Sequence, residues 1–375
     1  MKVLISPDKF KGSLSAQEVC EAIDRGVKKF DQRIETIFHP LADGGEGTLE
    51  NLQSSLELES VVVEVNDPLF RPVKAEYKIG GDNVYIEMAA ASGLPLLTEQ
   101  ERNCLYTTTY GTGELMLHAI NKGVNNIYLF VGGSATNDGG IGMANALGYQ
   151  FYDAENNELS PIGKELINIS RIDHSKMKID SNEINVTVVC DVKNPLFGPE
   201  GAAYIYGPQK GGNEEEIKML DKGLRNLSEV VYSTLGKDIA NLEGGGAAGG
   251  ISAGAYAFLN AKIKPGIQTI FEITKYEKKL ESVDLIITGE GKLDNQTIHG
   301  KVIHGVDQVS TKHNIPYAII CGIAEDLEML ERELNAAWIL QIKTPDLTLE
   351  SAINEAAEHV ENRAYQLIQD FTSTI

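Results

Sequence analysis

The sequence of 375 residues lacks the features that mark membrane, secreted and disulfide-rich proteins. No stretch approaches 18 consecutive apolar residues, so we expect no transmembrane helix. The first apolar run ends at Ser6 and Pro7, which is too short for a signal peptide. The four cysteines are far apart and form no C-x-x-C pair, so each should behave as a small buried hydrophobe. Together these absences predict a cytoplasmic protein.

Positive charge is also scarce, because 33 basic residues face 54 acidic ones and the net charge is −21. Such an acidic balance argues against nucleic acid or an anionic membrane surface as a partner. It does not exclude a small anionic ligand, since one pocket can differ in sign from the surface as a whole.

Several catalytic fingerprints are missing from the sequence. It contains no G-x-x-x-x-G-K-[ST] loop, no H-R-D or D-F-G of protein kinases and no H-E-x-x-H. Gly244, Gly246 and Gly249 do satisfy G-x-G-x-x-G, but Ile239–Glu243 before them makes a poor strand. A nucleotide-dependent dehydrogenase acting on a small hydroxy acid is therefore kept only as an alternative, and a two-domain solute-binding protein as a weaker one.

Strands and helices alternate at both ends of the chain. A strand at residues 2–5 leads to a helix that a Ser15–Glu18 capping box should open, and the alternation returns from about Val283. Between these ends, strands near 61–65, 73–79 and 84–88 follow one another as a meander. The pattern predicts an α/β protein of two domains. One is a doubly wound, Rossmann-like domain with a mostly parallel sheet, made of residues 1–60 and 270–375. The other, residues 61–269, is a mixed α/β domain inserted into it.

The glycines gather in four clusters: residues 43–48, 132–140, 244–250 and 289–294. A glycine loop that opens a helix exposes backbone N–H groups at the positive end of the helix dipole, which suits phosphate. Ordinary turn chemistry explains any single cluster equally well. Four clusters in one chain favour an anion site. Five lysines beside glycines or in strand-end loops can add positive charge: they are Lys9, Lys11, Lys210, Lys292 and Lys301.

Three aspartates stand at or just beyond predicted strand ends, Asp8, Asp43 and Asp191, and Asp294 lies in the glycine-rich loop after another strand. Ligands of open α/β sheets gather beyond that edge. Carboxylates there can help to hold Mg²⁺ with a nucleotide, or accept the proton of a hydroxyl nucleophile. A helix cap or a turn is the alternative role for any one of them.

Blocks along nearly the whole chain, in order, resemble the signatures of the type-1 glycerate kinases. They are Ser6–Ser15, Ala42–Thr48, Glu87–Leu94, Gly133–Gly140, Asp191–Leu196 with Gly207–Gly211, and Gly289–Thr297 with Gly300-Lys301. Two departures are visible: Ile303 stands where the family usually has proline, and Gly245 where it often has alanine. Neither removes a charged group.

The resemblance implies ATP- and Mg²⁺-dependent phosphorylation of D-glycerate to 2- or 3-phosphoglycerate, in a cleft between two α/β domains, and it is compatible with a homodimer. Asp191 is expected to be the base, because it ends a predicted strand and precedes the rigid Asn194-Pro195 turn. Asp294 is expected to hold Mg²⁺, with Asp191, or to share the base role, and Lys11 to contact an anion. The expected substrate-binding residues are Asp8, Lys9, Asp43, Glu46, Ser134, Asn137, Asp138, Lys210 and Gln296. The expected nucleotide-binding residues are Gly133, Gly246, Gly249, Gly289, Glu290, Lys292 and Lys301.

Overall fold

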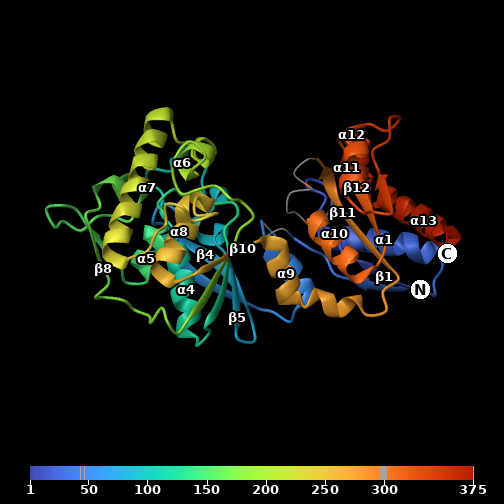
Figure 1. Ribbon diagram of the computed structural model, residues 1–375, viewed down its shortest axis with the longest axis horizontal. Helices are drawn as coiled ribbons and strands as arrows, with labels where there is room; N and C mark the ends of the chain where they lie inside the picture. The colour runs from blue at the N-terminus through green and yellow to red at the C-terminus, as the bar shows by residue number, and fades with distance from the viewer. Residues whose placement is uncertain (43, 46, 295–296, 298–301, 375) are drawn as a thin grey trace. The chain divides into compact units, whose positions relative to one another are not determined.

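The structure is a computed structural model that describes residues 1–42, 44–45, 47–294, 297 and 302–374. The chain divides into two compact units, and each contains a large β-sheet of its own (Figure 1). Unit 1 comprises Met1–Asp43, Glu50–Glu57 and Pro265–Ile375, and unit 2 comprises Gly44–Leu49 and Leu58–Lys264. Within the described residues, no helix combines the length and the apolar character that crossing a membrane requires.

Unit 1 contains a five-stranded sheet in which all neighbouring strands are parallel. Its order is β13-β12-β11-β1-β2. The strands are β1 (Lys2–Ile5), β2 (Glu35–Phe38), β11 (Leu285–Leu293), β12 (Tyr317–Ala324) and β13 (Trp338–Gln341). The two ends of the chain thus share one sheet through the pairing of β1 with β11, as the alternation at both ends predicts.

Helices cover both faces of this sheet. The crossovers β1–β2 and β11–β12 run in opposite directions along the sheet, and right-handed crossovers then put their helices on opposite faces. Accordingly α1 (Ala16–Phe30) packs on β1 and β2, and α13 (Ala356–Thr374) packs on α1, β12 and β13. By contrast, α10 (Val302–His313) packs on β11 and β12. The fold is therefore doubly wound. The other helices of unit 1 are α9 (Gly266–Thr274), η5 (Tyr276–Leu280), α11 (Leu327–Glu333) and α12 (Leu349–Asn354), while α2 (Thr48–Ser55) has residues in both units.

The start of α1 shows how local sequence sets an element boundary. Ser15 Oγ accepts a hydrogen bond from Glu18 N at 3.3 Å, and Glu18 Oε2 accepts one from Ser15 N at 2.8 Å. This is the predicted capping box, which satisfies backbone donors that the first turn leaves free. The buried side of the helix carries Val19, Ile23 and Val27, at helical spacing.

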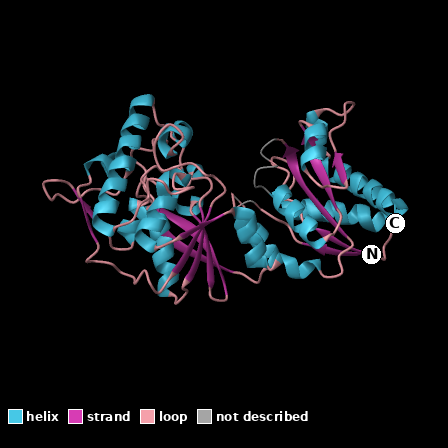
Figure 2. Ribbon diagram, viewed as in Figure 1, coloured by secondary structure: helices cyan, strands magenta, loops and turns pink. Residues whose placement is uncertain are grey.

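Unit 2 contains a six-stranded mixed sheet in the order β10-β9-β6-β5-β4-β3. The strands β3 (Glu59–Asn66), β4 (Pro72–Gly80) and β5 (Asn83–Glu87) form the predicted antiparallel meander. From β5 onward the sheet is parallel, through β6 (Asn126–Phe130), β9 (Asn185–Val189) and β10 (Lys262–Lys264). Figure 2 shows the helices that accompany these strands. They are α3 (Ala89–Ser92), α4 (Tyr110–Asn121), α5 (Ile141–Ala146), α6 (Ala202–Tyr206), α7 (Glu214–Leu235) and α8 (Ala247–Leu259). Between α5 and α6 in the chain, β7 (Gln150–Tyr152) and β8 (Arg171–Asp173) form a small antiparallel pair.

The prediction of a loop at residues 289–294 is wrong for most of its length, because these residues belong to a strand. The sequence predicts a strand that ends near Ile287 and a glycine-rich loop from Gly289, but β11 continues to Leu293. Its partner β12 stays in register as far as the pair Leu293↔Ala324. The reason is close packing, because a Cβ added to Gly289 would lie 2.0 Å from Ile320 O. The glycine that resembles a loop signal instead permits a tight strand contact.

Candidate active site

The sheet of unit 1 has a topological switch point between β1 and β11. The chain leaves β1 toward β2 on one side and leaves β11 toward β12 on the other. Loops that diverge in this way leave a crevice at the carboxyl ends of the two strands, where open α/β sheets bind ligands. The segments that follow β1 and β11 are therefore the first candidates for a site.

Backbone hydrogen bonds hold the segment after β1 against the end of β11. Ser6 N donates to Ile287 O at 2.8 Å, and Asp8 N donates to Gly289 O at 2.8 Å. The Asp8 carboxylate accepts a hydrogen bond from Lys9 N at 2.6 Å. Lys9 is half-buried and Lys11 is exposed. The structure thus places Asp8 and the two lysines in the segment that follows β1, beside the switch point.

Polar residues at the end of β11 contact one another. Glu290 is 7% exposed, and its Oε1 accepts a 2.6 Å hydrogen bond from Thr297 Oγ1. Asp294 N donates to the same threonine oxygen at 3.1 Å. Lys292 Nζ lies 2.8 Å from Glu325 Oε1 and 3.6 Å from Asp294 Oδ2, and the hydrogen bond to Glu325 raises the pKa of Lys292. Lys292 is therefore an ion-paired, half-exposed residue, and Glu290 and Asp294 are joined through Thr297 at the end of β11.

Four predicted site residues lie outside the described residues. They are Asp43, Glu46, Gln296 and Lys301.

In unit 2, two glycine loops pack against each other beyond the carboxyl ends of β6 and β9. Gly139 N donates to Gly249 O at 2.9 Å, and Gly246 N donates to Asn194 O at 3.0 Å. Gly249 has φ +73°, and a Cβ there would lie 2.0 Å from Thr136 O. Only glycine fits this position, since a side chain would clash with backbone as well as strain the left-handed conformation. We call residues 133–140 with 244–250 the glycine cradle; Gly133, Gly246 and Gly249 all belong to it.

Asp138 holds the glycine cradle together from inside. It is fully buried and accepts hydrogen bonds from Thr109 N, Thr109 Oγ1, Gly140 N and Gly142 N, at 2.7–3.2 Å. Burial raises the pKa of Asp138, while these donors oppose the shift. Its oxygens are occupied by protein donors, so the geometry makes it a structural support. The sequence prediction missed Thr109, although a run of three buried threonines, 107–109, marks the place.

Lys210 is a second buried support of the cradle. It is 2% exposed, and its Nζ donates to Ser134 Oγ and to Thr136 O, both at 2.7 Å. Desolvation lowers the pKa of Lys210 to about 8. Lys210 therefore fixes the loop that carries Ser134 and brings a buried positive charge next to it.

Asn137 lies between these supports with its own side chain unsatisfied. It is fully buried, yet neither Nδ2 nor Oδ1 has a hydrogen-bond partner among the described residues. The hydroxyl of Thr136 is likewise buried and unpartnered within the described part of the chain. Leaving buried polar groups unsatisfied costs free energy, so such groups mark a place where a ligand or water completes the bonding.

Asp191 follows β9 in an exposed loop. Its neighbour Asn194 is anchored, because Nδ2 donates to Glu200 O at 2.8 Å and Oδ1 accepts from Tyr206 OH at 2.7 Å. The Asn194 side chain is thus held in place, but residues 191–195 form no turn; the turn in this segment is at residues 199–200. Among the predicted residues, Asp191 belongs with Ser134, Asn137, Asp138 and Lys210 to unit 2, and the switch-point residues belong to unit 1.

The glycine pattern at residues 244–249 does not lie in a dinucleotide-binding unit. In that fingerprint the glycines follow a strand directly. Here Ile239–Glu243 has no strand, and the preceding element is α7. The structure gives the dehydrogenase alternative no support.

Comparison with known proteins places the whole chain in one family. The model of the glycerate kinase family matches residues 3–372. A glycerate kinase of Halalkalibacterium halodurans is 40% identical over 369 residues, with 96% of each chain covered. A glycerate 2-kinase of Escherichia coli is 40% identical over 362 residues, covering 96% of this chain and 95% of its own.

The fold comparison agrees with the sequence comparison. A crystal structure of a protein from Salmonella typhimurium LT2 matches with a TM-score of 0.90 at 40% identity, covering 100% of this chain and 99% of that one. The match extends through both sheets and both groups of candidate site residues. The chain therefore belongs to the glycerate kinase family of enzymes.

Proposed function

We propose that this protein transfers the γ-phosphoryl group of ATP to a hydroxyl of D-glycerate, with Mg²⁺ as the metal. The relatives named as glycerate kinases, about 40% identical over nearly the whole chain, carry the proposal. The described residues add polar groups beyond parallel strand ends, where small-molecule sites of α/β proteins form.

We propose 2-phosphoglycerate as the product, and type 1 as the subgroup of the family. The name of the Escherichia coli relative, glycerate 2-kinase, supports the first. The ordered blocks from Ser6–Ser15 to Gly289–Thr297 support the second.

Glycerate is anionic and its hydroxyls are weak nucleophiles, so the site must hold a carboxylate and accept a hydroxyl proton. We assign the proton acceptor to Asp191, because it is exposed, follows β9 and is joined to an anchored Asn194. The unsatisfied amide of Asn137 and the nearby Ser134 are assigned to glycerate. Lys210 and Asp138 contribute by fixing the loop and by charge.

The nucleotide phosphates are assigned to the switch point. Lys9 and Lys11 supply positive charge there, with Asp8 beside them. The glycine cradle is the other candidate for anion binding, through its backbone N–H groups.

Mg²⁺ fits the donor set as a metal that arrives with the nucleotide. Among the described residues, no group of three or more His, Cys, Asp or Glu side chains could hold a metal ion. Mg²⁺ in kinases is held by one or two carboxylates together with substrate phosphates, so a small donor set is suitable. We assign Asp294 and Asp191 as carboxylate ligands; the bound ion would neutralise charge on the transferring phosphoryl group.

We further propose that the two units act as domains, with residues 61–269 inserted into the domain made of 1–60 and 270–375. Each unit has a hydrophobic cluster of its own among the described residues, which supports this division. Cytoplasmic location is proposed on two grounds, the use of ATP and the four free cysteines.

The direct test is incubation of the purified chain with D-glycerate and Mg-ATP, with ADP release measured and the product identified by NMR. We expect 2-phosphoglycerate, and no reaction without glycerate. Thermal-shift measurements with ATP–Mg²⁺, NAD(P)H and glycerate, one at a time, separate the alternatives. Stabilisation by NAD(P)H but not by ATP would contradict the proposal.

A further inference from the structure

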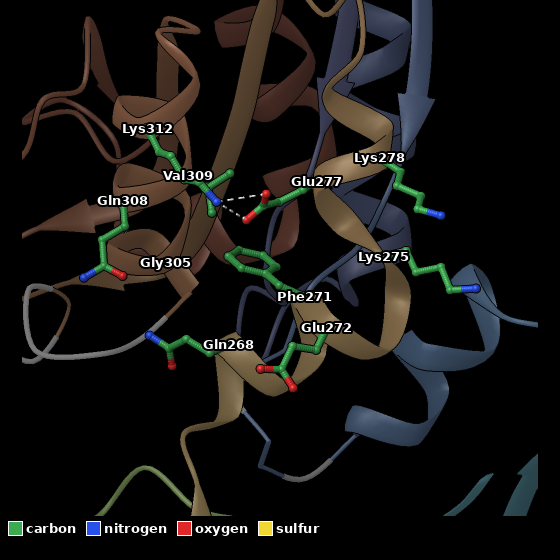
Figure 3. Close-up of a pocket in the computed structure, with 10 residues that line it drawn as sticks. All are labelled: Gln268, Phe271, Glu272, Lys275, Glu277, Lys278, Gly305, Gln308, Val309 and Lys312. Carbon is green, nitrogen blue, oxygen red and sulfur yellow. Dashed lines mark hydrogen bonds and ion pairs between the residues drawn. The ribbon is translucent and has the colours of Figure 1, made fainter. Parts of the chain in front are cut away.

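A pocket in unit 1 lies between α9, η5 and α10 (Figure 3). Its volume is about 620 Å³, within the range of roughly 300–1,000 Å³ that small-molecule sites occupy. None of its lining residues is among those that the sequence predicts for the site. Its lining combines an aromatic ring, two side-chain amides, three lysines and two glutamates.

The aromatic floor of the pocket is Phe271. Its ring is half-buried and stacks on Tyr276, with centroids 4.3 Å apart and an interplanar angle of 19°. Tyr276 covers one face of the ring, and Figure 3 shows Phe271 in the middle of the lining residues. Val309 and Gly305, both buried on α10, line the pocket beside it. A flat ligand can therefore stack on Phe271 without displacing a charged group.

The amide of Gln268 needs a hydrogen-bond donor. Its Oε1 atom is buried and has no partner among the described residues. The second amide, Gln308, has its Nε2 2.9 Å from His304 Nε2. A buried acceptor without a donor is costly, so a ligand that fits here should present an N–H group at the edge of its plane. A planar heterocycle with an exocyclic amino group, such as adenine, meets both requirements.

The charges around the pocket favour an anionic ligand. The lining includes three lysines and two glutamates, Glu272 and Glu277, so positive charge is in excess here although the net charge of the chain is −21. Lys312 is paired with Glu277 at 2.8 and 3.0 Å, whereas Lys275 and Lys278 form no ion pair within the described residues. In Figure 3 the ammonium groups of Lys275 and Lys278 extend away from Phe271. They would attract an anion by their field and would not contact the stacked base.

The pocket also begins close to the carboxyl edge of the sheet. Gly305 is in the first turn of α10, the helix that follows β11 in the chain. Tyr276, behind Phe271, bonds through its hydroxyl to Ser6 Oγ at 2.9 Å, where the segment after β1 starts. A nucleotide with its base in the pocket could thus direct its phosphates toward the edge that carries Asp8, Lys9 and Glu290.

We propose that this pocket holds the adenine base of the phosphoryl donor, stacked on Phe271 with its amino group donating to Gln268 Oε1. The assignment of the base to the donor rests on the proposed function. It also assigns nucleotide binding to unit 1.

The test is calorimetric binding of AMP to the full chain, because AMP carries the base and one phosphate but has no γ-phosphoryl group to transfer. Gln268→Leu and Phe271→Leu should each weaken AMP binding about tenfold, and should raise KM for ATP with KM for glycerate unchanged. Gln17→Leu is the control, since Gln17 lies on α1 of the same unit and its side chain bonds Glu21; it should bind AMP normally. Thermal unfolding of each variant checks that the fold is retained.

A second readout separates a base contact from a structural effect. Inosine triphosphate has a carbonyl oxygen where ATP has the amino group, so the wild-type chain should prefer ATP. Gln268→Leu should reduce that preference, which a change in stability alone would not do. Unchanged AMP affinity in both variants, or equal use of the two triphosphates by the wild-type chain, overturns the proposal and leaves glycerate phosphorylation standing. AMP binding that depends on Gln268 and Phe271, in a chain that does not phosphorylate glycerate, would keep the base pocket and remove the proposed reaction.

Discussion

Two aspartates of unit 2, Asp138 and Asp191, have different environments and therefore different roles. Asp138 and Asp191 both follow strands of the unit 2 sheet in the chain. Four donors occupy Asp138, which is fully buried, whereas Asp191 is exposed. A carboxylate saturated by protein donors cannot accept a substrate proton without losing those bonds. The proposed base is therefore Asp191. Asp138 supports the cradle through its four hydrogen bonds, and its binding of substrate stays a prediction.

Asp191→Asn should lower kcat by about 10²–10⁴-fold, the usual contribution of a positioned general base. The substitution keeps the shape of the side chain and removes its proton acceptor. The measurement is steady-state kinetics at saturating ATP and glycerate, with circular dichroism to verify folding.

Asp82→Asn is the matched control for this variant. Asp82 is also exposed and in unit 2, but it precedes β5 and so lies at the amino end of that strand. Its kcat should equal that of the wild-type chain. If Asp191→Asn stays active while Asp294→Asn does not, the base and metal roles are reversed; if both stay active, the base is another residue.

His39 makes stability depend on pH. It is fully buried, bonds Thr274 Oγ1 and Ser55 Oγ through its two ring nitrogens, and burial lowers its pKa to about 3. Between pH 6.5 and 3, His39 binds a proton in the unfolded chain but stays neutral in the folded chain. The free energy of unfolding is therefore not reduced by His39 above pH 6.5, and it decreases as the pH falls toward 3.

We expect His39 alone to remove about 1.4 kcal/mol of unfolding free energy per pH unit in that window. His39→Gln retains hydrogen-bonding groups and removes the titration, so its unfolding free energy should fall less steeply between pH 6.5 and 4. Urea unfolding at several pH values measures this slope. Parallel curves for the two proteins would mean that His39 is protonated in the folded state.

At the scale of elements, local sequence patterns predicted individual helices and strands but not the contacts between segments that are distant in the sequence. The capping box of α1 and the alternation of the meander depend on neighbouring residues, and both predictions are confirmed. The length of β11 depends on Gly289 packing against Ile320 O, a contact that the sequence does not display. The candidate base pocket was missed for the same reason, because α9 and α10 supply its lining from separate parts of the chain.

The glycine cradle offers a prediction at this scale. Gly249→Ala should destabilise the fold by more than about 1–2 kcal/mol, the cost of left-handed backbone alone, because its Cβ would also meet Thr136 O at 2.0 Å. Activity should fall as well, since the displaced loop carries Asn137. Chemical denaturation and kinetics measure the two effects.

Gly236→Ala is a control that separates the cost of left-handed backbone from the steric clash of an added Cβ. Gly236 ends α7 with φ +68°, and a Cβ there meets nothing within 4 Å. This variant should show only the backbone cost, with normal kcat. Equal destabilisation in the two variants would mean that the cradle yields to the added methyl group.

At the scale of the molecule, residues far apart in the sequence build one edge. Thr288 Oγ1 donates to Ser6 O at 2.8 Å, across 282 positions of chain. Sequence alternation predicted that both chain ends share a sheet, and the pairing of β1 with β11 confirms it. Which loops then meet at the switch point follows from strand order, which alternation alone does not specify.

The proposed division into domains predicts that unit 2 can fold alone. Residues 58–264 form one continuous segment with all six strands of its sheet, the whole glycine cradle and a hydrophobic core of its own. Removing the rest deletes Leu49 N, which donates to Glu87 Oε1 at 3.1 Å, so a modest loss of stability is expected. The isolated segment should nevertheless unfold cooperatively in urea and keep its far-ultraviolet circular dichroism.

The isolated segment should not bind AMP, because the residues of the proposed base pocket all belong to unit 1. A segment that is unfolded in buffer would mean that the two units form one cooperative body, and a folded segment that binds AMP would assign the nucleotide to the glycine cradle.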